Sequence, residues 1–113
     1  SVEKYQTEAE ACQQLLPSET QLFRPPYGRI TRAQITALAH FRLVMWDVLT
    51  YDFDQSLPAE SCLQNSIRAT RNGSIVVFHD SLKAEKNLMH ALPRYLEHFA
   101  ERGYQFVSLS SGV

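Results

Sequence analysis

The segment FRPPYG, Phe23–Gly28, ends a short apolar run with an arginine, two prolines and a tyrosine. Each proline ring fixes φ at about −65°, removes an N–H donor and disfavours the helical region for the residue before it. The backbone is therefore expected to leave a short strand in a rigid, extended form that holds Arg24 still. Tyr27 and Gly28 are the first residues after the prolines that offer an N–H group again. For the segment taken alone, the alternative is a proline-rich turn with a surface arginine.

Helical and extended patterns alternate along the chain. Thr31 and Gln34 form the pattern of a capping box, and the β-branched run 74–78 is typical of a strand buried in a parallel sheet. Gly103 is expected to end the last helix, and Pro93 either kinks that helix or begins its second part. The expected strands are 22–24, 41–46, 74–78 and 104–109, and the expected helices are 2–16, 31–39, 58–71 and 83–102. This alternation predicts an α/β fold with parallel strands joined by right-handed crossovers.

Polar side chains stand where three of these strands are expected to end. Arg24 follows the first strand, Asp47 the second and His79 the third. In parallel α/β folds the chemistry gathers at the C-terminal ends of the strands. Each of these residues would be a weak signal alone, but together they predict a functional site at this edge.

Composition describes an ordinary globular domain of 113 residues, with 44% hydrophobic residues, 20% charged residues and a formal net charge of −1. No run of Lys and Arg could neutralise a line of phosphates, so we expect no nucleic-acid partner. No apolar stretch approaches the roughly 18 residues that cross a bilayer, and the first five residues do not resemble a signal peptide. The cell envelope and the cytoplasm both stay open as compartments.

Cys12 and Cys62 lack the CxxC spacing of a zinc or redox site. We expect free thiols, with a disulfide between the two as the open alternative. The count of elements sets a further expectation, because four strands leave two unpaired edges and a closed α/β barrel needs roughly twice this length. The chain is therefore expected to be a small open-sheet domain or part of a larger fold, and to self-associate through its edges if it stands alone.

Three segments in order resemble the third, fourth and fifth motifs of the NodB-type polysaccharide deacetylases, a family of carbohydrate esterases. Arg24-Pro25-Pro26-Tyr27 matches the R-x-P-Y motif fully. In the run 46–53 Asp52 aligns with the last aspartate of the fourth motif, whereas Phe53 replaces the usual tryptophan and Leu49 a common aspartate. Val77-Phe78-His79 matches L-x-H with valine for leucine. The resemblance implies that residues 1–113 are the C-terminal half of a distorted (β/α) barrel.

The resemblance also implies a metal-dependent hydrolase that removes N-acetyl groups from glycans of the chitin oligosaccharide or peptidoglycan type. It assigns His79 as the general acid and Asp52 as the carboxylate that orients it. It pairs Arg24 with a general-base aspartate, and it aims the backbone N–H of Tyr27 at the oxyanion. The base and the ligands of the divalent metal, zinc in this interpretation, belong to the family's first two motifs. This sequence contains neither motif, so the chain alone is expected to be inactive.

Further residues receive weaker assignments. The resemblance implies that four apolar side chains line the sugar site, namely Trp46, Phe53, Phe78 and Pro26. Ordinary core packing is the alternative. Three histidines, His40, His90 and His98, are isolated on helical segments and are expected to be surface or packing residues. Asp47 and Asp80 are expected to be local hydrogen-bonding partners.

Two other functions stay open. The replacements at Leu49 and Phe53 are compatible with a hydrolase of another non-peptide C–N bond on the same fold. A non-catalytic carbohydrate-binding or structural relic is the second alternative. Bound metal and release of acetate separate these classes, since only the deacetylase is expected to have both.

Overall fold

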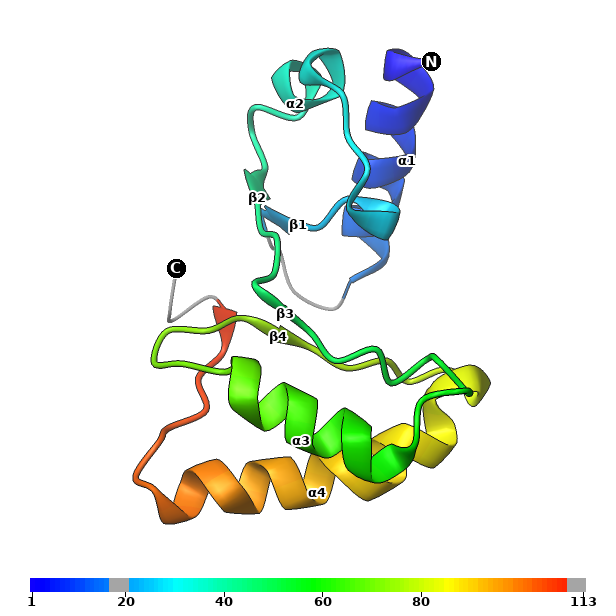
Figure 1. Ribbon diagram of the computed structural model, residues 1–113. Coiled ribbons are helices and arrows are strands. Elements are labelled where there is room, and N and C mark those ends of the chain that lie inside the picture. The colour runs from blue at the N-terminus through cyan, green and yellow to red at the C-terminus, as the bar shows by residue number, and fades with distance from the viewer. Residues whose placement is uncertain (17–20, 110–113) are drawn as a thin grey trace. The chain divides into compact units, whose positions relative to one another are not determined.

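The computed structural model describes residues 1–16 and 21–109, and its contacts divide the chain into two compact units (Figure 1). The N-terminal unit is Ser1–Met45 and the C-terminal unit is Trp46–Val113. Each unit contains one two-stranded parallel sheet with a helix between its strands; a further helix precedes the strands in the N-terminal unit and follows them in the C-terminal unit. The expected alternation of helices and parallel strands is confirmed, although the strands within the described residues pair as two separate two-stranded sheets.

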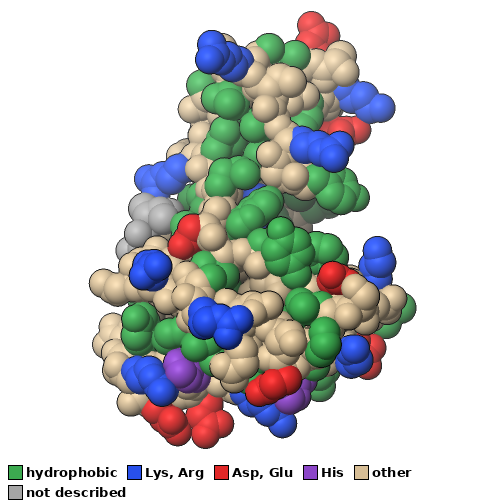
Figure 2. Space-filling model, in the orientation of Figure 1, with side chains coloured by type: hydrophobic (Ala, Val, Ile, Leu, Met, Phe, Trp, Pro, Cys, Tyr) green, Lys and Arg blue, Asp and Glu red, His purple; other side chains and the backbone are tan. Residues whose placement is uncertain are grey.

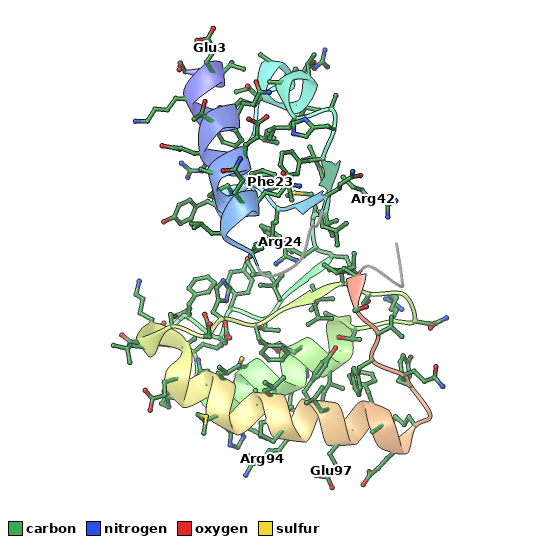
Figure 3. The ribbon with its side chains drawn as sticks, turned by 180° about the vertical axis from the view of Figure 1, so that it is seen from behind. Glu3, Phe23, Arg24, Arg42, Arg94 and Glu97 are labelled. Carbon is green, nitrogen blue, oxygen red and sulfur yellow. The ribbon has the colours of Figure 1, made fainter. Side chains whose placement is uncertain are left out.

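The N-terminal unit contains α1 (Val2–Leu15), β1 (Leu22–Phe23), the 3-10 turn η1 (Pro26–Gly28), α2 (Arg32–Ala37) and β2 (Arg42–Leu43). The expected capping box begins α2: the Gln34 N–H donates to Thr31 Oγ1 over 3.2 Å, and the Thr31 N–H donates to Gln34 Oε1 over 2.9 Å. Phe23 of β1 reaches α1 (Figure 3), where its ring lies 6.0 Å from that of Tyr5. A small core of Ala9, Leu38 and Phe41 holds this unit together.

The C-terminal unit contains β3 (Val48–Leu49), α3 (Ala59–Ala69), β4 (Val76–Val77), the 3-10 turn η2 (Leu82–Ala84) and α4 (Glu85–Glu101). Helices α3 and α4 lie side by side and cover the same face of the β3–β4 pair (Figure 1). The core between them is apolar and is formed by Cys62, Leu63, Ala91, Tyr95 and Phe99. Pro93 lies inside α4, which continues past it as one helix.

Gly103 ends α4 as expected. Its φ of 82° is left-handed, which glycine adopts without steric cost. The following Tyr104 N–H donates to the Phe99 carbonyl over 3.0 Å, and the Gly103 N–H donates to the Ala100 carbonyl over 3.1 Å. These two bonds satisfy carbonyl groups in the last turn of the helix.

The expected strand at 41–46 is wrong in its bounds, and the strand at Val48–Leu49 was not expected. Two successive short strands, β2 and β3, replace the one strand that was expected, and each belongs to a different sheet. The Val44 N–H donates to Phe23 of β1 over 2.8 Å, whereas the Val48 N–H donates to Ile75, next to β4, over 3.2 Å. Asp47 therefore precedes a strand instead of ending one. Its carboxylate accepts the Ile75 N–H, and this bond lowers its pKa.

The expected strand at 104–109 is also wrong for the part of the chain that the structure describes. Residues 104–108 join neither sheet, and the side chains of Phe106 and Val107 are 53% and 65% exposed. The aromatic and β-branched residues of this segment favour a strand, but a strand requires a neighbour for its N–H and C=O groups. Nothing among the described residues supplies that neighbour.

No helix in the described ranges has the length and apolar character needed to cross a membrane. Lys and Arg side chains are scattered over the face shown in Figure 2, without a basic patch on that face. Arg94 and Glu97 of α4 point away from α3 (Figure 3).

Candidate active site

A buried carboxylate and a half-buried imidazole form the most constrained polar contact of the C-terminal unit. Asp52 has an exposed fraction of 0%, and the His79 side chain is 38% exposed. Asp52 Oδ1 lies 2.7 Å from His79 Nδ1, and Asp52 Oδ2 accepts the backbone N–H of His79 over 2.6 Å. One carboxylate therefore holds the ring and the main chain of the same residue.

This contact determines where the protons of His79 lie. An ionised carboxylate only accepts hydrogen bonds, so Nδ1 must carry a hydrogen to bind Asp52. Nε2 is then the ring nitrogen that Asp52 does not bind. A histidine with this arrangement can donate a proton from Nε2 as an imidazolium and take one back as a neutral ring.

The parallel pairing of β3 and β4 explains how residues 27 positions apart meet. The register pairs Leu49 with Val77, so the chain leaves both strands at the same edge. Thr50 extends the pairing, because its N–H and its Oγ1 both donate to the Val77 carbonyl, over 3.3 and 2.7 Å. Asp52 and His79 follow within a few residues.

The loop that carries Asp52 is fixed at both ends. Tyr51 adopts a left-handed φ of 57°, and its carbonyl accepts the Asp54 N–H over 3.0 Å. The Asp54 carbonyl in turn accepts Nδ2 of Asn87, a residue of α4 that is 1% exposed, over 3.0 Å. Asn87 Oδ1 is buried and has no hydrogen-bond partner in the described parts of the chain.

Sequence reasoning missed Asn87, although a signal was present. Asn87 stands four residues before Ala91 on the stripe that continues through Tyr95 and Phe99, and those three residues are buried. A polar residue on a buried helical stripe requires a partner, because an unpaired amide inside a protein is costly. Here the partner is the backbone of the loop after β3.

Aromatic rings continue from His79 along this loop. The Phe53 ring lies edge-on to the His79 ring, with centroids 5.2 Å apart, and the Tyr51 ring lies 5.7 Å from Phe53. Phe78 instead contacts Tyr95 at 5.4 Å and packs against the core, and Trp46 is half-buried. Of the expected sugar-site aromatics, the structure places Phe53 beside His79.

The proline segment lies in the N-terminal unit. Arg24 follows β1 directly, and its Nε donates to the Val44 carbonyl over 3.4 Å. Pro25 is buried, Pro26 is exposed, and Tyr27 has φ 57° with a side chain that is 92% exposed. The Gly28 N–H is occupied by the Pro25 carbonyl at 2.9 Å, whereas the Tyr27 N–H donates to no group in the described ranges.

Several known proteins resemble the chain in sequence or in fold. No family model matches the chain. The chain is 30% identical over 95 residues to a peptidoglycan-N-acetylglucosamine deacetylase of Bacillus cereus, a match that covers 81% of this chain and 45% of that protein. It is 32% identical over 68 residues to a bifunctional xylanase/xylan deacetylase of Cellvibrio japonicus, over 58% of this chain and 10% of that protein. Over most of its length the chain is therefore similar in sequence to a polysaccharide deacetylase, as the NodB-type motifs led us to expect.

Two solved structures share the fold. The Xyl-CE4 domain of a multidomain xylanase from the hindgut metagenome of Trinervitermes trinervoides matches with a TM-score of 0.86 at 23% identity, over 99% of this chain and 55% of that chain. A family 4 carbohydrate esterase from Streptomyces lividans, in complex with acetate, matches with a TM-score of 0.80 at 24% identity, over 99% and 60%. The chain spans less than two thirds of each of these relatives.

The other three histidines were expected to be surface or packing residues, and each makes a contact away from the Asp52–His79 pair. His90 pairs with Glu60 at 3.0 Å between α4 and α3, and His40 lies 3.5 Å from Glu10. His98 packs against the ring of Phe99 at 4.8 Å. These contacts agree with the expected surface and packing roles.

Both cysteines are free thiols, as expected. Cys62 is buried beneath the site, where its Sγ donates to the Thr50 carbonyl over 3.4 Å. Burial raises the pKa of the Cys62 thiol, and the nearby charge of Asp52 raises it further. Because the thiolate is the nucleophilic form, this environment makes Cys62 a packing residue rather than a nucleophile.

A divalent metal, which the family resemblance implies, finds no ligand set here. Within residues 1–16 and 21–109, no three His, Cys, Asp or Glu side chains are grouped so that they could hold an ion. The carboxylate of Asp52 is already occupied by its two bonds to His79.

Proposed function

We propose that this chain is the C-terminal portion of a hydrolase that removes N-acetyl groups from a polysaccharide of the chitin oligosaccharide or peptidoglycan type. The observation that carries the proposal is the two-point contact of Asp52 with the ring and the main chain of His79. Two deacetylase relatives and the R-x-P-Y, Asp52 and His79 motifs support it. On this proposal residues 1–113 complete a distorted barrel whose other half binds the metal.

His79 would protonate the departing amine. Hydrolysis joins a water oxygen to the acetyl carbon and breaks the C–N bond, whose electron pair goes to nitrogen. An amine is a poor leaving group unless it gains a proton as the bond breaks, and His79 Nε2 can supply that proton. The ionised Asp52 would stabilise the imidazolium before the transfer and keep its ring in place. The products are acetate and a free amino sugar.

By the family motif, Tyr27 and Arg24 of the N-terminal unit would take two further roles in the reaction. The Tyr27 N–H follows two residues without N–H groups and has no acceptor in the described ranges, so it is available to an oxyanion. Arg24 would hold a general-base aspartate from outside this chain in an ionised, oriented state, as its planar guanidinium suits. Phe53 would lie against the sugar, and we keep Trp46, Pro26 and Phe78 as further candidates for contact with substrate.

The family resemblance implies a divalent metal, zinc in our interpretation, which would activate the attacking water. The described residues do not fit such an ion, so we place its ligands outside this chain. None of the roles assigned above to His79, Asp52, Arg24 and Tyr27 passes through the metal.

A second candidate substrate is acetylated xylan. The name of the Cellvibrio japonicus relative contains xylan deacetylase. In acetylated xylan the acetyl group is bound to the sugar through an ester rather than an amide. The same Asp52–His79 pair could protonate a sugar oxygen. The two substrates differ in how strongly the reaction depends on this proton, because an amine leaves less readily than an alcohol.

The test is acetate release by a protein that contains this chain together with the metal-binding half. We expect acetate from tetra-N-acetylchitotetraose or peptidoglycan, and a large loss of rate in His79→Ala. Glu97→Gln is the matched control, because Glu97 is an exposed group of α4 that points away from α3 (Figure 3). The absence of acetate from chito-oligosaccharide, peptidoglycan and acetylxylan alike, with metal supplied, would refute the proposal.

A further inference from the structure

Thr50 is a buried threonine at the end of β3, and each of its polar groups has a partner. The residue is 3% exposed. Its N–H and its Oγ1 both donate to the Val77 carbonyl, and its own carbonyl accepts the Cys62 thiol over 3.4 Å. A buried hydroxyl is costly unless it is bonded, and valine has the same branched shape without that cost. The hydroxyl at this position therefore requires a reason other than the filling of space.

The Thr50 hydroxyl makes the shorter of the two bonds to Val77. Oγ1 lies 2.7 Å from the Val77 oxygen, whereas the backbone nitrogen of Thr50 lies 3.3 Å from the same oxygen. The usual N–H···O distance ends at about 3.2 Å, so the main-chain bond is long, while the O–H bond has an ordinary length. The junction between the ends of β3 and β4, which run side by side (Figure 1), therefore depends mainly on a side chain.

This junction comes directly before the Asp52–His79 pair on both strands. A single residue separates Thr50 from Asp52. A single residue likewise separates Val77 from His79. The two bonds from His79 to Asp52 are short, at 2.6 and 2.7 Å, and the carboxylate has an exposed fraction of 0%, so water cannot easily replace them. A change in the distance between the two strand ends would therefore pass to the pair almost undiminished.

We propose that Thr50 is a positioning residue, whose hydroxyl fixes the distance between the ends of β3 and β4 and thereby holds Asp52 against Nδ1 of His79. This inference rests on the proposed function, because it concerns the proton that His79 would donate. It adds a requirement for a hydroxyl at position 50, which serine meets and valine does not. A hydroxyl with a purely structural role would affect the stability of the unit and leave the His79 ring as it is.

Three substitutions of Thr50 and one matched control separate these two roles. Thr50→Ser keeps the hydroxyl, Thr50→Val replaces it with a methyl group, and Thr50→Ala puts nothing in its place. Thr70→Val is the control, since Thr70 of the same unit has a hydroxyl 2.8 Å from the Ser66 carbonyl and 2.8 Å from the Tyr95 hydroxyl. The loss of a bonded hydroxyl should lower the melting temperature by about 4–8 °C at either position.

The first measurement is the tautomer of His79, read from its nitrogen chemical shifts in the chain. We expect the hydrogen on Nδ1 in the wild type, in Thr50→Ser and in Thr70→Val. In Thr50→Val and Thr50→Ala the shifts of the two ring nitrogens should move toward each other, because a ring that Asp52 no longer holds exchanges between its two tautomers. This readout does not require acetate release.

The second measurement is acetate release by a protein that contains this chain together with the metal-binding half. A displacement of about 1 Å can cost about 10²-fold in rate, so we expect Thr50→Val and Thr50→Ala to lower kcat at least about tenfold. KM should stay the same, since the bond that is lost acts on the proton transfer rather than on substrate binding. Thr50→Ser should keep kcat within about threefold, and Thr70→Val should match the wild type.

An unchanged His79 tautomer in both Thr50→Val and Thr50→Ala would overturn the inference, and so would an equal change in Thr70→Val. A loss of kcat in Thr50→Ser as large as in Thr50→Ala would also overturn it, because the hydroxyl would then not be the group that matters. If the wild type released no acetate, the proposed function would fail, and the nitrogen shifts would still decide the role of Thr50. Acetate release by Thr50→Ala at the wild-type rate would refute this inference alone.

Discussion

Asp52→Asn changes one atom of the proposed site and tests its central contact. In the wild type both carboxylate oxygens accept, one from the His79 main chain at 2.6 Å and one from Nδ1 at 2.7 Å. An asparagine has a single oxygen. If that oxygen still accepts the backbone N–H, the new NH₂ group faces Nδ1. The imidazole must then adopt the tautomer in which Nδ1 has a lone pair and Nε2 carries the hydrogen.

The magnitude follows from the bonds that change. The variant exchanges one charge-assisted hydrogen bond for a neutral one, which lowers the free energy of unfolding by about 1 kcal/mol. The effect on chemistry is much larger, because the imidazolium that donates the proton would direct its Nδ1–H at an NH₂ group. General acid catalysis contributes about 10²–10⁴-fold, so we expect the deacetylation rate to fall by a similar factor.

Two measurements check this prediction. Nitrogen chemical shifts of His79 in the chain report which ring nitrogen carries the hydrogen, and acetate release reports the rate. The wild type should show a hydrogen on Nδ1, and Asp52→Asn should move it to Nε2. Glu97→Gln should change neither. If Asp52→Asn kept the hydrogen on Nδ1, or deacetylated within threefold of the wild-type rate, the role given to this carboxylate would be wrong.

Three further predictions concern the same unit. His79→Ala should slow hydrolysis of an N-acetyl sugar by at least about 10²-fold, but barely affect p-nitrophenyl acetate, whose leaving group needs no proton; equal losses would exclude a general acid. Asn87→Leu should lower the free energy of unfolding by about 1 kcal/mol, because the bond to Asp54 is lost together with an unpaired buried oxygen; calorimetry measures this change. The variant should also reduce the rate of acetate release. An unchanged rate would show that the loop needs no anchor. The raised pKa of Cys62 means that the unfolded chain loses its thiol proton at a lower pH than the folded chain, so the free energy of unfolding should fall as pH rises above about 9. Cys62→Ser should make this dependence on pH weaker, as measured by urea unfolding at several pH values. An equal dependence in both proteins would contradict the prediction.

Local patterns predicted much of this structure. The capping box at Thr31 and Gln34, the glycine stop at Gly103 and the parallel pairing of the strand near Val76 were all expected from short stretches of sequence. The meeting of Asp52 and His79 was expected from the family motifs, and the β3–β4 register provides its geometric basis. The roles of both residues stay predictions.

Other features depended on contacts that no local pattern encodes. The run 41–46 was expected to be one strand that ends at Asp47. The hydrogen bonds of this part of the chain instead pass from Phe23, bound by Val44, to Ile75, bound by Val48, so the strand at Val48 was missed. The segment 104–108 contains the aromatic and β-branched residues typical of a strand, but pairing is a property of two segments. Asn87 was overlooked because its partner is a backbone carbonyl 33 residues away.

The complete burial of Asp52 has a consequence for the order in which the unit assembles. Its carboxylate cannot leave water at reasonable cost until the amide and ring of His79 are in place, and these come 27 residues later, beyond α3. The site therefore forms after the β3–α3–β4 crossover has closed. The His79 amide should accordingly be a reporter of late folding, whose exchange with deuterated solvent requires the opening of the whole crossover rather than the fraying of a loop.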